Sequence, residues 1–305
     1  MSNNTTKIIS DIELTKRMGW SFEQKIDHSL YVIENFLAQY PESIISFSGG
    51  LDSTVMLYLV RIISKNQKAV FCNTTNEFTE IIKFVKQKEN VEIVKPKITF
   101  IEVLQQYGFP LISKEVAHMI SYMQHPTKFN EKTRLNYSLR KKEKSLYALA
   151  NKWEFLIKAP FNITDKCCYY LKKKPMLPYV NNGNFIGTKV VDSRLRKTSY
   201  QKQGCINERN NTCFPLSLWS REEILRFIKE NALPVSKIYE TESSTGCAYC
   251  GFGCQFDPTR FYRLQKKEPN RYNTIINTEN NGVKYRDAIR MVYERTLNLL
   301  PLFYD

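Results

Sequence analysis

The stretch of residues 44–53 constrains the fold of this chain more than any other part of its sequence. An apolar run, Ile-Ile-Ser-Phe, is followed at once by Ser-Gly-Gly-Leu-Asp-Ser. This order predicts a short buried strand, a tight glycine turn and a helix from residue 52 to about residue 65. Glycines let a backbone approach an anion closely, and the amides and dipole at a helix start attract phosphate. The stretch therefore predicts a nucleotide-phosphate site, with an ordinary Gly-Gly turn capped by Asp52 as the structural alternative.

Three polar side chains of this turn have predicted roles. The hydroxyls of Ser48 and Ser53 can donate hydrogen bonds to phosphate oxygens, whereas the carboxylate of Asp52 cannot. We expect Asp52 to bind Mg²⁺ or a loop amide instead. The Walker ending, Gly-Lys followed by Ser or Thr, is missing, so an ordinary P-loop kinase or GTPase is disfavoured. The predicted nucleotide-binding residues of the segment are Ser46, Ser48, Gly49, Gly50, Asp52 and Ser53.

Strands and helices alternate after this segment. Further strands are predicted at 68–72 and 91–94, with a helix at 79–88 between them. This alternation predicts an α/β fold with a parallel sheet and right-handed crossovers. Farther along we predict helical residues over 112–152, strands at 154–157 and 185–191, a loop at 179–184, and a helix at 220–230 that begins with a capping box of Ser220 and Glu223.

Both ends of the chain are predicted to be helical. Apolar residues recur at helical spacing over 11–40, and Pro41 ends that pattern. A helical tail is predicted over 258–300, interrupted around 277–282, after a loop at 245–257 that is rich in Cys and Gly. We therefore expect an N-terminal helical segment (1–42), an α/β domain that contains the cysteines (43–257) and a helical C-terminal tail (258–305).

The composition indicates the kind of partner. Lys and Arg number 45 against 30 Asp and Glu, a formal net charge of +15. Such a field attracts phosphate-rich molecules, so tRNA or DNA is the first expected partner and a small anionic nucleotide is the alternative. The first residues are polar, and no apolar run approaches the ~20 residues that span a bilayer. We therefore expect a cytoplasmic protein without a membrane partner.

The chain has eight cysteines, and several of them are clustered. In a reducing compartment, clustered cysteines favour a metal, iron–sulfur or catalytic role over a disulfide framework. Cys167 and Cys168 are adjacent, and Cys247 and Cys250 form a C-x-x-C that Cys254 follows. Thiolates are the usual ligands of iron–sulfur clusters. No histidine lies near these cysteines in sequence, so zinc, the main rival, would need an all-cysteine site. Buried cysteines acting as small apolar residues are the structural alternative.

The phosphate segment resembles the PP-loop of the adenine-nucleotide α-hydrolase-like superfamily, whose members bind ATP or an adenylyl-sulfate and act at the α-phosphate. The cysteine pattern narrows this resemblance to the phosphoadenylyl-sulfate (PAPS) reductase family. Members of its iron–sulfur adenylyl-sulfate reductase branch carry a tandem Cys pair, a Lys four residues on and a distant C-x-x-C, and the DNA phosphorothioation branch is similar. The resemblance implies a PP-loop α/β domain in which a [4Fe–4S] cluster lies beside Lys172 and is held by Cys167, Cys168, Cys247 and Cys250.

Further motifs extend the resemblance over residues 44–256. Asn73 and Thr74 follow the second strand, where the superfamily binds adenine. Residues 187–189 and 192–196 resemble the segments that bind the anionic end of the substrate, with Lys189 in place of Arg and Asp192 in place of Glu. Arg forms bidentate anion contacts that Lys cannot reproduce. By resemblance, Asn73, Thr74 and Gly187 are cofactor-binding residues, and Asp52, Lys189 and Arg196 are catalytic residues.

One part of the reductase pattern has no counterpart here. The reductases attack sulfate with a cysteine in a C-terminal tail, and no cysteine follows Cys254 in this sequence. Cys254, Cys205 and Cys213 are candidates for carrying sulfur, and Cys254 is the predicted catalytic thiol. Each of the three can equally be structural or a cluster ligand.

Basic residues with interleaved tyrosines suggest a surface for nucleic acid. Cations neutralise phosphates and aromatic rings stack on bases, whereas a solvated charged helix face is the alternative. The residues of the first predicted helical stretch are Lys128, Lys132, Arg134, Tyr137, Arg140, Lys141, Lys142, Lys144 and Tyr147; those near the predicted site are Lys172, Lys173, Lys174, Arg194, Arg196 and Lys197.

Three functions are compatible with these features. In the first, ATP adenylylates a nucleic acid with release of pyrophosphate, and sulfur from a donor such as a cysteine desulfurase displaces AMP, as in relatives that act in DNA phosphorothioation and tRNA thiolation. In the second, adenylyl-sulfate or its 3′-phosphate is reduced to sulfite with thioredoxin as partner. In the third, a non-catalytic subunit binds the nucleotide and the cluster. The net charge and the missing tail cysteine favour the first, and the cysteine pattern favours the second.

Overall fold

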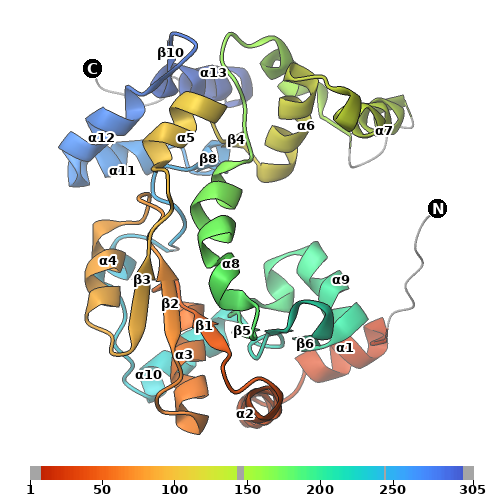
Figure 1. Cartoon of the computed structure of the whole chain (residues 1–305), viewed down its shortest axis with the longest axis vertical. Coiled ribbons are helices and arrows are strands. Elements are labelled where there is room, and N and C mark those ends of the chain that lie inside the picture. The colour runs from red at the N-terminus through yellow and green to blue at the C-terminus, as the bar shows by residue number, and fades with distance from the viewer. Residues whose placement is uncertain (1–7, 143–147, 244, 298–305) are drawn as a thin grey trace. The chain divides into compact units, whose positions relative to one another are not determined.

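The chain folds into two compact units, and each unit is built from three separate stretches of the sequence. The computed structural model describes residues 8–142, 148–243 and 245–297. Unit 1 comprises residues 1–73, 77–95 and 175–245, and unit 2 comprises residues 74–76, 96–174 and 246–305. The N-terminal helices therefore belong to unit 1, and the C-terminal tail belongs to unit 2. Figure 1 shows the chain coloured by residue number, with its helices and strands labelled.

A six-stranded sheet forms the centre of unit 1 (Figure 1). Its order is β3-β2-β1-β5-β7-β6, and every neighbouring pair is parallel except β6 with β7. The mostly parallel sheet confirms the predicted α/β class. The strands are β1 (Ile44–Ser46), β2 (Ala69–Cys72), β3 (Val91–Val94), β5 (Asn184–Phe185), β6 (Ile206–Asn207) and β7 (Thr212–Cys213).

Helices pack their apolar faces against this sheet, and its central strands are therefore buried. Ile45 and Phe185 on adjacent strands are both 0% exposed, as are Phe36 on the helix at residues 22–39 and Val55 on the helix at residues 51–63. Side-chain capping fixes several helix starts, including the predicted capping box of Ser220. The helices are α1 (Asp11–Met18), α2 (Phe22–Gln39), α3 (Leu51–Ile63), α4 (Thr79–Lys86), α9 (Arg194–Gln203) and α10 (Arg221–Glu230), with 3₁₀ turns η4 (Val190–Asp192), η5 (Glu208–Asn210) and η6 (Lys237–Glu240).

Unit 2 is mainly helical around a small aromatic core. Phe109, Tyr249 and Tyr285 are fully buried, and the Tyr285 hydroxyl donates to the Tyr249 carbonyl at 3.0 Å. Its strands are the parallel pair β4 (Leu111–Ile112) and β8 (Gly251–Phe252) and the antiparallel pair β9 (Glu279–Asn280) and β10 (Val283–Lys284). Its helices are α5 (Phe100–Tyr107), α6 (Lys114–Gln124), α7 (Glu131–Lys142), α11 (Arg260–Lys267), α12 (Pro269–Ile276) and α13 (Tyr285–Leu297).

Several shorter elements differ from the sequence-based expectations. Residues 154–157, predicted as a strand, lie in the 3₁₀ helix η2 (Asn151–Lys158). The predicted loop at 179–184 begins inside α8 (Lys174–Val180), a helix that contains Pro178. Of the predicted strand 185–191, only Phe185 lies in a strand, because β5 ends there and the chain enters the 3₁₀ turn η4 at Val190. The remaining short helical turns are η1 (Lys128–Asn130), the π-helix η3 (Tyr169–Lys173) and η7 (Cys254–Phe256). Among the described helices, none has the length and apolarity to cross a lipid bilayer.

Candidate functional site

The phosphate loop lies where the order of the parallel sheet reverses. From β1 the chain passes to β2 and β3 on one side, and later to β5 and β7 on the other. In open α/β sheets, ligands bind beyond the carboxyl ends of the strands at such a switch point. The loop after β1 contains Ser48, Gly49 and Gly50, and the loop after β5 contains Gly187 and Lys189. The two predicted segments therefore come from neighbouring strands of one unit.

Two glycines in these loops occupy positions that a side chain would disturb. Gly49 has a φ of +72°, and a Cβ there would lie 3.0 Å from Ile81 and 3.1 Å from Val85. A left-handed backbone is strained for other residues. A Cβ on Gly187 would lie 3.2 Å from the Asp52 carbonyl oxygen. Gly187 therefore lets the loop after β5 pass against the first turn of α3.

The hydroxyls of Ser48 and Ser53 brace the loop from inside. Ser53 Oγ accepts from the Ser48 amide at 3.2 Å and donates to the Gly50 carbonyl at 3.0 Å. The two hydroxyls lie 3.0 Å apart, and Ser48 Oγ also accepts from the Gly50 amide at 3.3 Å. The serines predicted to meet phosphate therefore hold the shape of the turn.

Two residues that the sequence analysis did not identify contact the start of α3. Its N-cap is Gly50, which has no capping side chain, and the Leu51 amide donates instead to the Tyr239 hydroxyl at 3.0 Å. Tyr239 is bonded in turn to the Thr245 hydroxyl, at 2.8 Å. Both residues belong to unit 1 but lie nearly two hundred positions downstream. No local pattern links them to the loop, so only the tertiary structure reveals them.

A network of four charges joins the phosphate loop to the loop after β5. The Lys189 side chain is 4% exposed, and its ammonium lies 2.6 Å from Asp52 Oδ2 and 3.2 Å from Asp192 Oδ1. Asp192 also accepts from Arg196 Nη1 at 2.6 Å. Burial alone would raise the pKa of Asp192, but the Lys189 amide and the charges of Lys189 and Arg196 lower it. Lys189 is thus neutralised by two carboxylates of its own chain and fixes the position of Asp52.

One oxygen of Asp52 remains available for a cation. Asp52 Oδ1 is buried and has no hydrogen-bond partner among the described residues, whereas Oδ2 is paired with Lys189. A carboxylate oxygen beside a phosphate site is the usual protein ligand of Mg²⁺, which keeps several waters of its own. The donor atom therefore fits the expected Mg²⁺, and Asp52 is the residue that would hold it.

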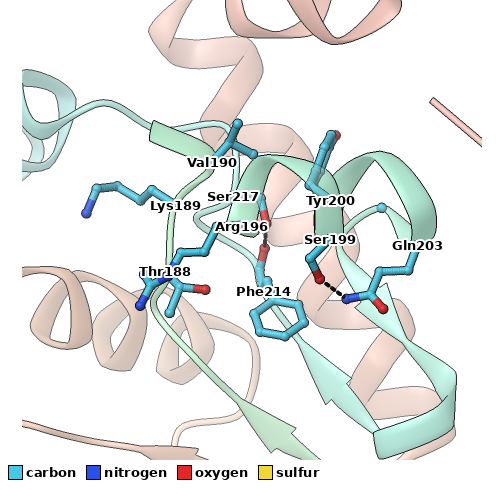
Figure 2. Close-up of a pocket in the computed structure, with 10 residues that line it drawn as sticks. Thr188, Lys189, Val190, Arg196, Ser199, Tyr200, Gln203, Phe214 and Ser217 are labelled. Atoms are coloured by element: carbon cyan, nitrogen blue, oxygen red, sulfur yellow. Dashed lines mark hydrogen bonds between the residues drawn. The ribbon is translucent and has the colours of Figure 1, made fainter. Parts of the chain in front are cut away.

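A small cavity lies beside this network. It has a volume of about 60 Å³ and is lined by residues of unit 1 that include Thr188, Lys189, Arg196 and Ser199. Figure 2 shows the Lys189 side chain extending away from Ser199, whose hydroxyl accepts from Gln203 at 2.8 Å. Because ligand pockets usually measure at least ~300 Å³, this cavity is too small for a nucleotide. It borders the charged network and is distinct from a nucleotide pocket.

The other three residues predicted to bind the nucleotide, Ser46, Asn73 and Thr74, form hydrogen bonds within the protein. The Ser46 hydroxyl donates to Asn184 on the neighbouring strand at 2.8 Å, so it links β1 to β5. Asn73 follows β2, and its amide donates to the Val94 carbonyl at 2.9 Å. Thr74 belongs to unit 2, where it is 0% exposed and accepts from the Asn76 amide at 3.3 Å. Adenine binding at Asn73 and Thr74 stays a prediction.

Unit 2 holds the four cysteines of the predicted cluster. Hydrogen bonding to Cys168, burial and the charges of Cys250 and Cys247 raise the pKa of Cys167. Hydrogen bonding from Cys167 and the charges of Lys114 and Lys172 lower the pKa of Cys168. These couplings show that the tandem pair and the C-x-x-C lie within electrostatic reach of each other. Among the described residues, no three Cys, His, Asp or Glu side chains form a ready-made metal site.

The donor set nevertheless suits an iron–sulfur cluster in its chemistry. All four groups are thiols, which are the ligands of [4Fe–4S] clusters. The C-x-x-C turn is held by Arg260, which donates to the Cys250 carbonyl at 2.9 Å.

The remaining cysteines considered as sulfur carriers are buried. Cys254 is 0% exposed, and burial raises its pKa to about 11. Burial likewise raises the pKa of Cys205 to about 11 and raises that of Cys213 well above its usual value. A nucleophilic thiol is normally accessible and has a lowered pKa. These environments favour structural roles, and a catalytic role for Cys254 stays a prediction.

The basic stretch predicted for nucleic acid forms α7 and the turn before it. Lys132, Lys141 and Lys142 are exposed there, and Arg134 is half-buried and donates to Asn130 at 2.8 Å. The Arg140 side chain, and Lys144 and Tyr147 altogether, lie outside the described residues. Phe129, on the preceding turn, is fully exposed. The described part of the stretch is thus a largely solvated basic helix.

Comparison with known proteins adds a family match. A model of the phosphoadenosine phosphosulfate reductase domain matches residues 42–110 and 91–257, which include the phosphate loop and all four cysteines of the predicted cluster. A search of curated protein sequences finds no match. Among the solved structures that match is the crystal structure of phosphoadenylyl-sulfate (PAPS) reductase from Candida auris in a phosphate complex. It is 14% identical, covers 76% of this chain and 92% of its own, and has a TM-score of 0.40.

Proposed function

Because the chain belongs to the phosphoadenosine phosphosulfate reductase domain family and is a PAPS-reductase-like enzyme, we propose that it catalyses ATP-dependent sulfur transfer to nucleic acid. An oxygen of the nucleic acid attacks the α-phosphate of ATP, and the bond to pyrophosphate breaks. Hydrosulfide, or a donor persulfide together with a reducing thiol, then attacks the adenylylated centre. AMP leaves with the former acceptor oxygen, and sulfur takes its place, so no net oxidation of the acceptor occurs. A cysteine desulfurase is a suitable donor of the persulfide.

The charged network at the phosphate loop is the observation that best supports adenylyl transfer. The loop amides can hold the phosphates, and Asp52 Oδ1 can hold Mg²⁺ against them. Lys189 is buried between Asp52 and Asp192 and keeps the Asp52 carboxylate in place. Mg²⁺ would offset negative charge on the triphosphate and on the pyrophosphate as it departs. A bound [4Fe–4S] cluster at Cys167, Cys168, Cys247 and Cys250 would supply a site that can bind or relay sulfur.

The charge of the chain supports nucleic acid as the acceptor. A formal net charge of +15 suits a polyanion better than a small sulfonucleotide. Reduction of adenylyl-sulfate to sulfite with thioredoxin is the second candidate. The family match and the tandem cysteine pair favour it, since both are shared with the reductases that the chain resembles.

Product analysis separates the two candidates. Anaerobically purified protein is incubated with ATP, Mg²⁺, sulfide and bulk tRNA or DNA, and in parallel with adenylyl-sulfates and reduced thioredoxin. We expect pyrophosphate release that depends on nucleic acid and the incorporation of sulfur into that nucleic acid. Sulfite release from adenylyl-sulfate, without pyrophosphate release from ATP, would establish the reductase instead. Asp52→Asn is the matched inactive control, because it weakens the Mg²⁺ ligand without changing the volume of the side chain.

Replacement of Gly50 tests the assignment of the phosphate loop. A Cβ at Gly50 would lie 3.2 Å from the Thr245 hydroxyl and 3.3 Å from the Ser48 hydroxyl, so valine crowds the face that phosphate must approach. We expect Gly50→Val to weaken ATP or adenylyl-sulfate binding at least about ten-fold by titration calorimetry, the loss of about one good hydrogen bond. Gly19→Ala is the control, since its Cβ meets only ordinary contacts in unit 1. Unchanged affinity in Gly50→Val would exclude this loop as the nucleotide site.

A further inference from the structure

Three tyrosines and several lysines form a compact aromatic and basic surface in unit 2. The rings of Tyr107 and Tyr170 are stacked, with centroids 4.8 Å apart and an angle of 19° between their planes. Tyr169 meets Tyr170 edge-on, with centroids 5.3 Å apart at 76°. All three residues lie in the part of unit 2 that spans residues 96–174. We call this group, with its lysines, the tyrosine platform.

Two lysine ammonium groups lie over the rings of the stacked pair. The Lys166 ammonium lies 5.1 Å from the centre of the Tyr107 ring, and the Lys174 ammonium lies 5.5 Å from that of Tyr170. Cations over aromatic faces are attracted by the ring electrons, so these contacts hold the stack in place. Tyr107 and Tyr170, which are both partly buried, therefore support the neighbouring ring of Tyr169.

Tyr169 is the exposed member of the platform. Tyr169 is 47% exposed, and it begins the π-helix η3, which continues through the exposed Lys172 and Lys173. π-helical turns are rare and frequently occur at functional sites. The nearby carboxylate of Asp165 is engaged with His118, 3.2 Å away. The platform thus combines one accessible ring, a cluster of exposed ammonium groups and an acid that already has a partner.

We propose that the tyrosine platform binds single-stranded nucleic acid, with one unpaired base stacked on Tyr169 and the flanking phosphates bound by Lys166, Lys172, Lys173 and Lys174. This inference rests on the proposed function, because it identifies where the nucleic-acid substrate is held. Stacking on an aromatic ring together with cationic contacts to the backbone is the general mode of single-strand recognition. Tyr169 directly follows Cys168, a predicted cluster ligand, in the sequence. A base stacked on Tyr169 would therefore be held beside the predicted sulfur chemistry.

The test separates base stacking from phosphate binding. Fluorescence anisotropy measures the affinity of the cluster-loaded full chain for a labelled single-stranded oligonucleotide and for the same backbone with abasic sites. We expect Tyr169→Ala to weaken binding of the base-containing strand by about ten-fold and to leave abasic binding unchanged. Tyr169→Phe keeps the ring and should bind like the unmodified protein. Tyr31→Ala removes a tyrosine that is 64% exposed in unit 1 and should have no effect.

Lys173→Met probes the phosphate contacts of the same surface. It should weaken both strands alike and reduce the slope of log affinity against log salt by about 0.7, the value for one phosphate contact on a single strand. Tyr169→Ala should leave that slope unchanged. Equal iron contents in the variants and the unmodified protein show that Cys168 has not been disturbed.

The remaining outcomes reject different hypotheses about this surface. Strong nucleic-acid binding that Tyr169→Ala does not weaken would reject the platform and leave the proposed function standing. An equal loss for base-containing and abasic strands would reject stacking on Tyr169. No binding of either strand at low salt would reject the platform and the proposed function together. A protein partner could instead compete with the oligonucleotide for this surface. If both Tyr169→Ala and Tyr169→Phe abolished binding of that partner, the surface would be assigned to protein recognition.

Discussion

Replacing any one of Cys167, Cys168, Cys247 or Cys250 with serine should remove most of the iron from anaerobically purified protein. The unmodified chain should be brown and contain about four irons, because four thiolates are the ligand set of a [4Fe–4S] cluster. Loss of one ligand leaves an incomplete set and an exposed edge of the cluster. Iron and sulfide analysis, with the visible absorption spectrum, measures the effect.

Cys72→Ser is the control for the cysteine replacements. Cys72 is half-buried at the end of β2, in the unit that holds none of the four predicted ligands. Its replacement should leave the iron content unchanged. A colourless unmodified protein that contains one equivalent of zinc would instead support the all-cysteine zinc site.

Lys189→Met should lower the free energy of unfolding by about 3 kcal/mol, the usual cost of breaking a buried ion pair from one side. Lys189 is 4% exposed and lies between Asp52 and Asp192, so methionine leaves two partly buried carboxylates facing each other. Urea denaturation monitored by circular dichroism measures the change. ATP binding should weaken as well, because Asp52 loses the partner that positions it.

Lys197→Met removes a comparable lysine from the surface of the same unit. Lys197 is 48% exposed and pairs with Asp11 at 3.1 Å, where solvent screens the charges. Exposed pairs of this kind contribute about 1 kcal/mol or less, so its stability should barely change. If both variants had the same free energy of unfolding, the Lys189 network would contribute no more to stability than an exposed ion pair does.

The sequence predicts those elements of the fold whose apolar pattern is long or whose turns have a chemical signature. The strand before Ser48, the helix after Gly50 and the capping box at Ser220 all follow such signals, and the structure confirms them. The apolar run in residues 154–157 is too short to separate a strand from a 3₁₀ helix. A proline normally ends a helix, yet α8 contains Pro178, so the local preference of this residue does not predict the helix.

The candidate site is only partly readable from sequence, because its contacts are long-range. Spacing alone identifies the phosphate loop, and resemblance draws attention to Lys189. Neither could indicate that the Lys189 ammonium is occupied by Asp52, 137 positions away. Tyr239 reaches the Leu51 amide across 188 positions and has no motif around it. Burial is also invisible in the spacing of the cysteines, although it distinguishes Cys254 from an accessible nucleophile.

The interleaved path of the chain has a consequence for synthesis on the ribosome. When residue 95 emerges, β1 can already pair with β2, but β5 (residues 184–185), which pairs with its other edge, has not yet been made. All of residues 96–174, which belong to unit 2, must be made in that interval. Unit 2 is also incomplete then, because β4 pairs with β8 at residues 251–252. A nascent chain therefore carries an open strand edge beside its phosphate loop, and open edges invite non-native pairing. Slow translation between residues 95 and 184 would lengthen that exposure, whereas a chaperone that shields β1 would shorten it.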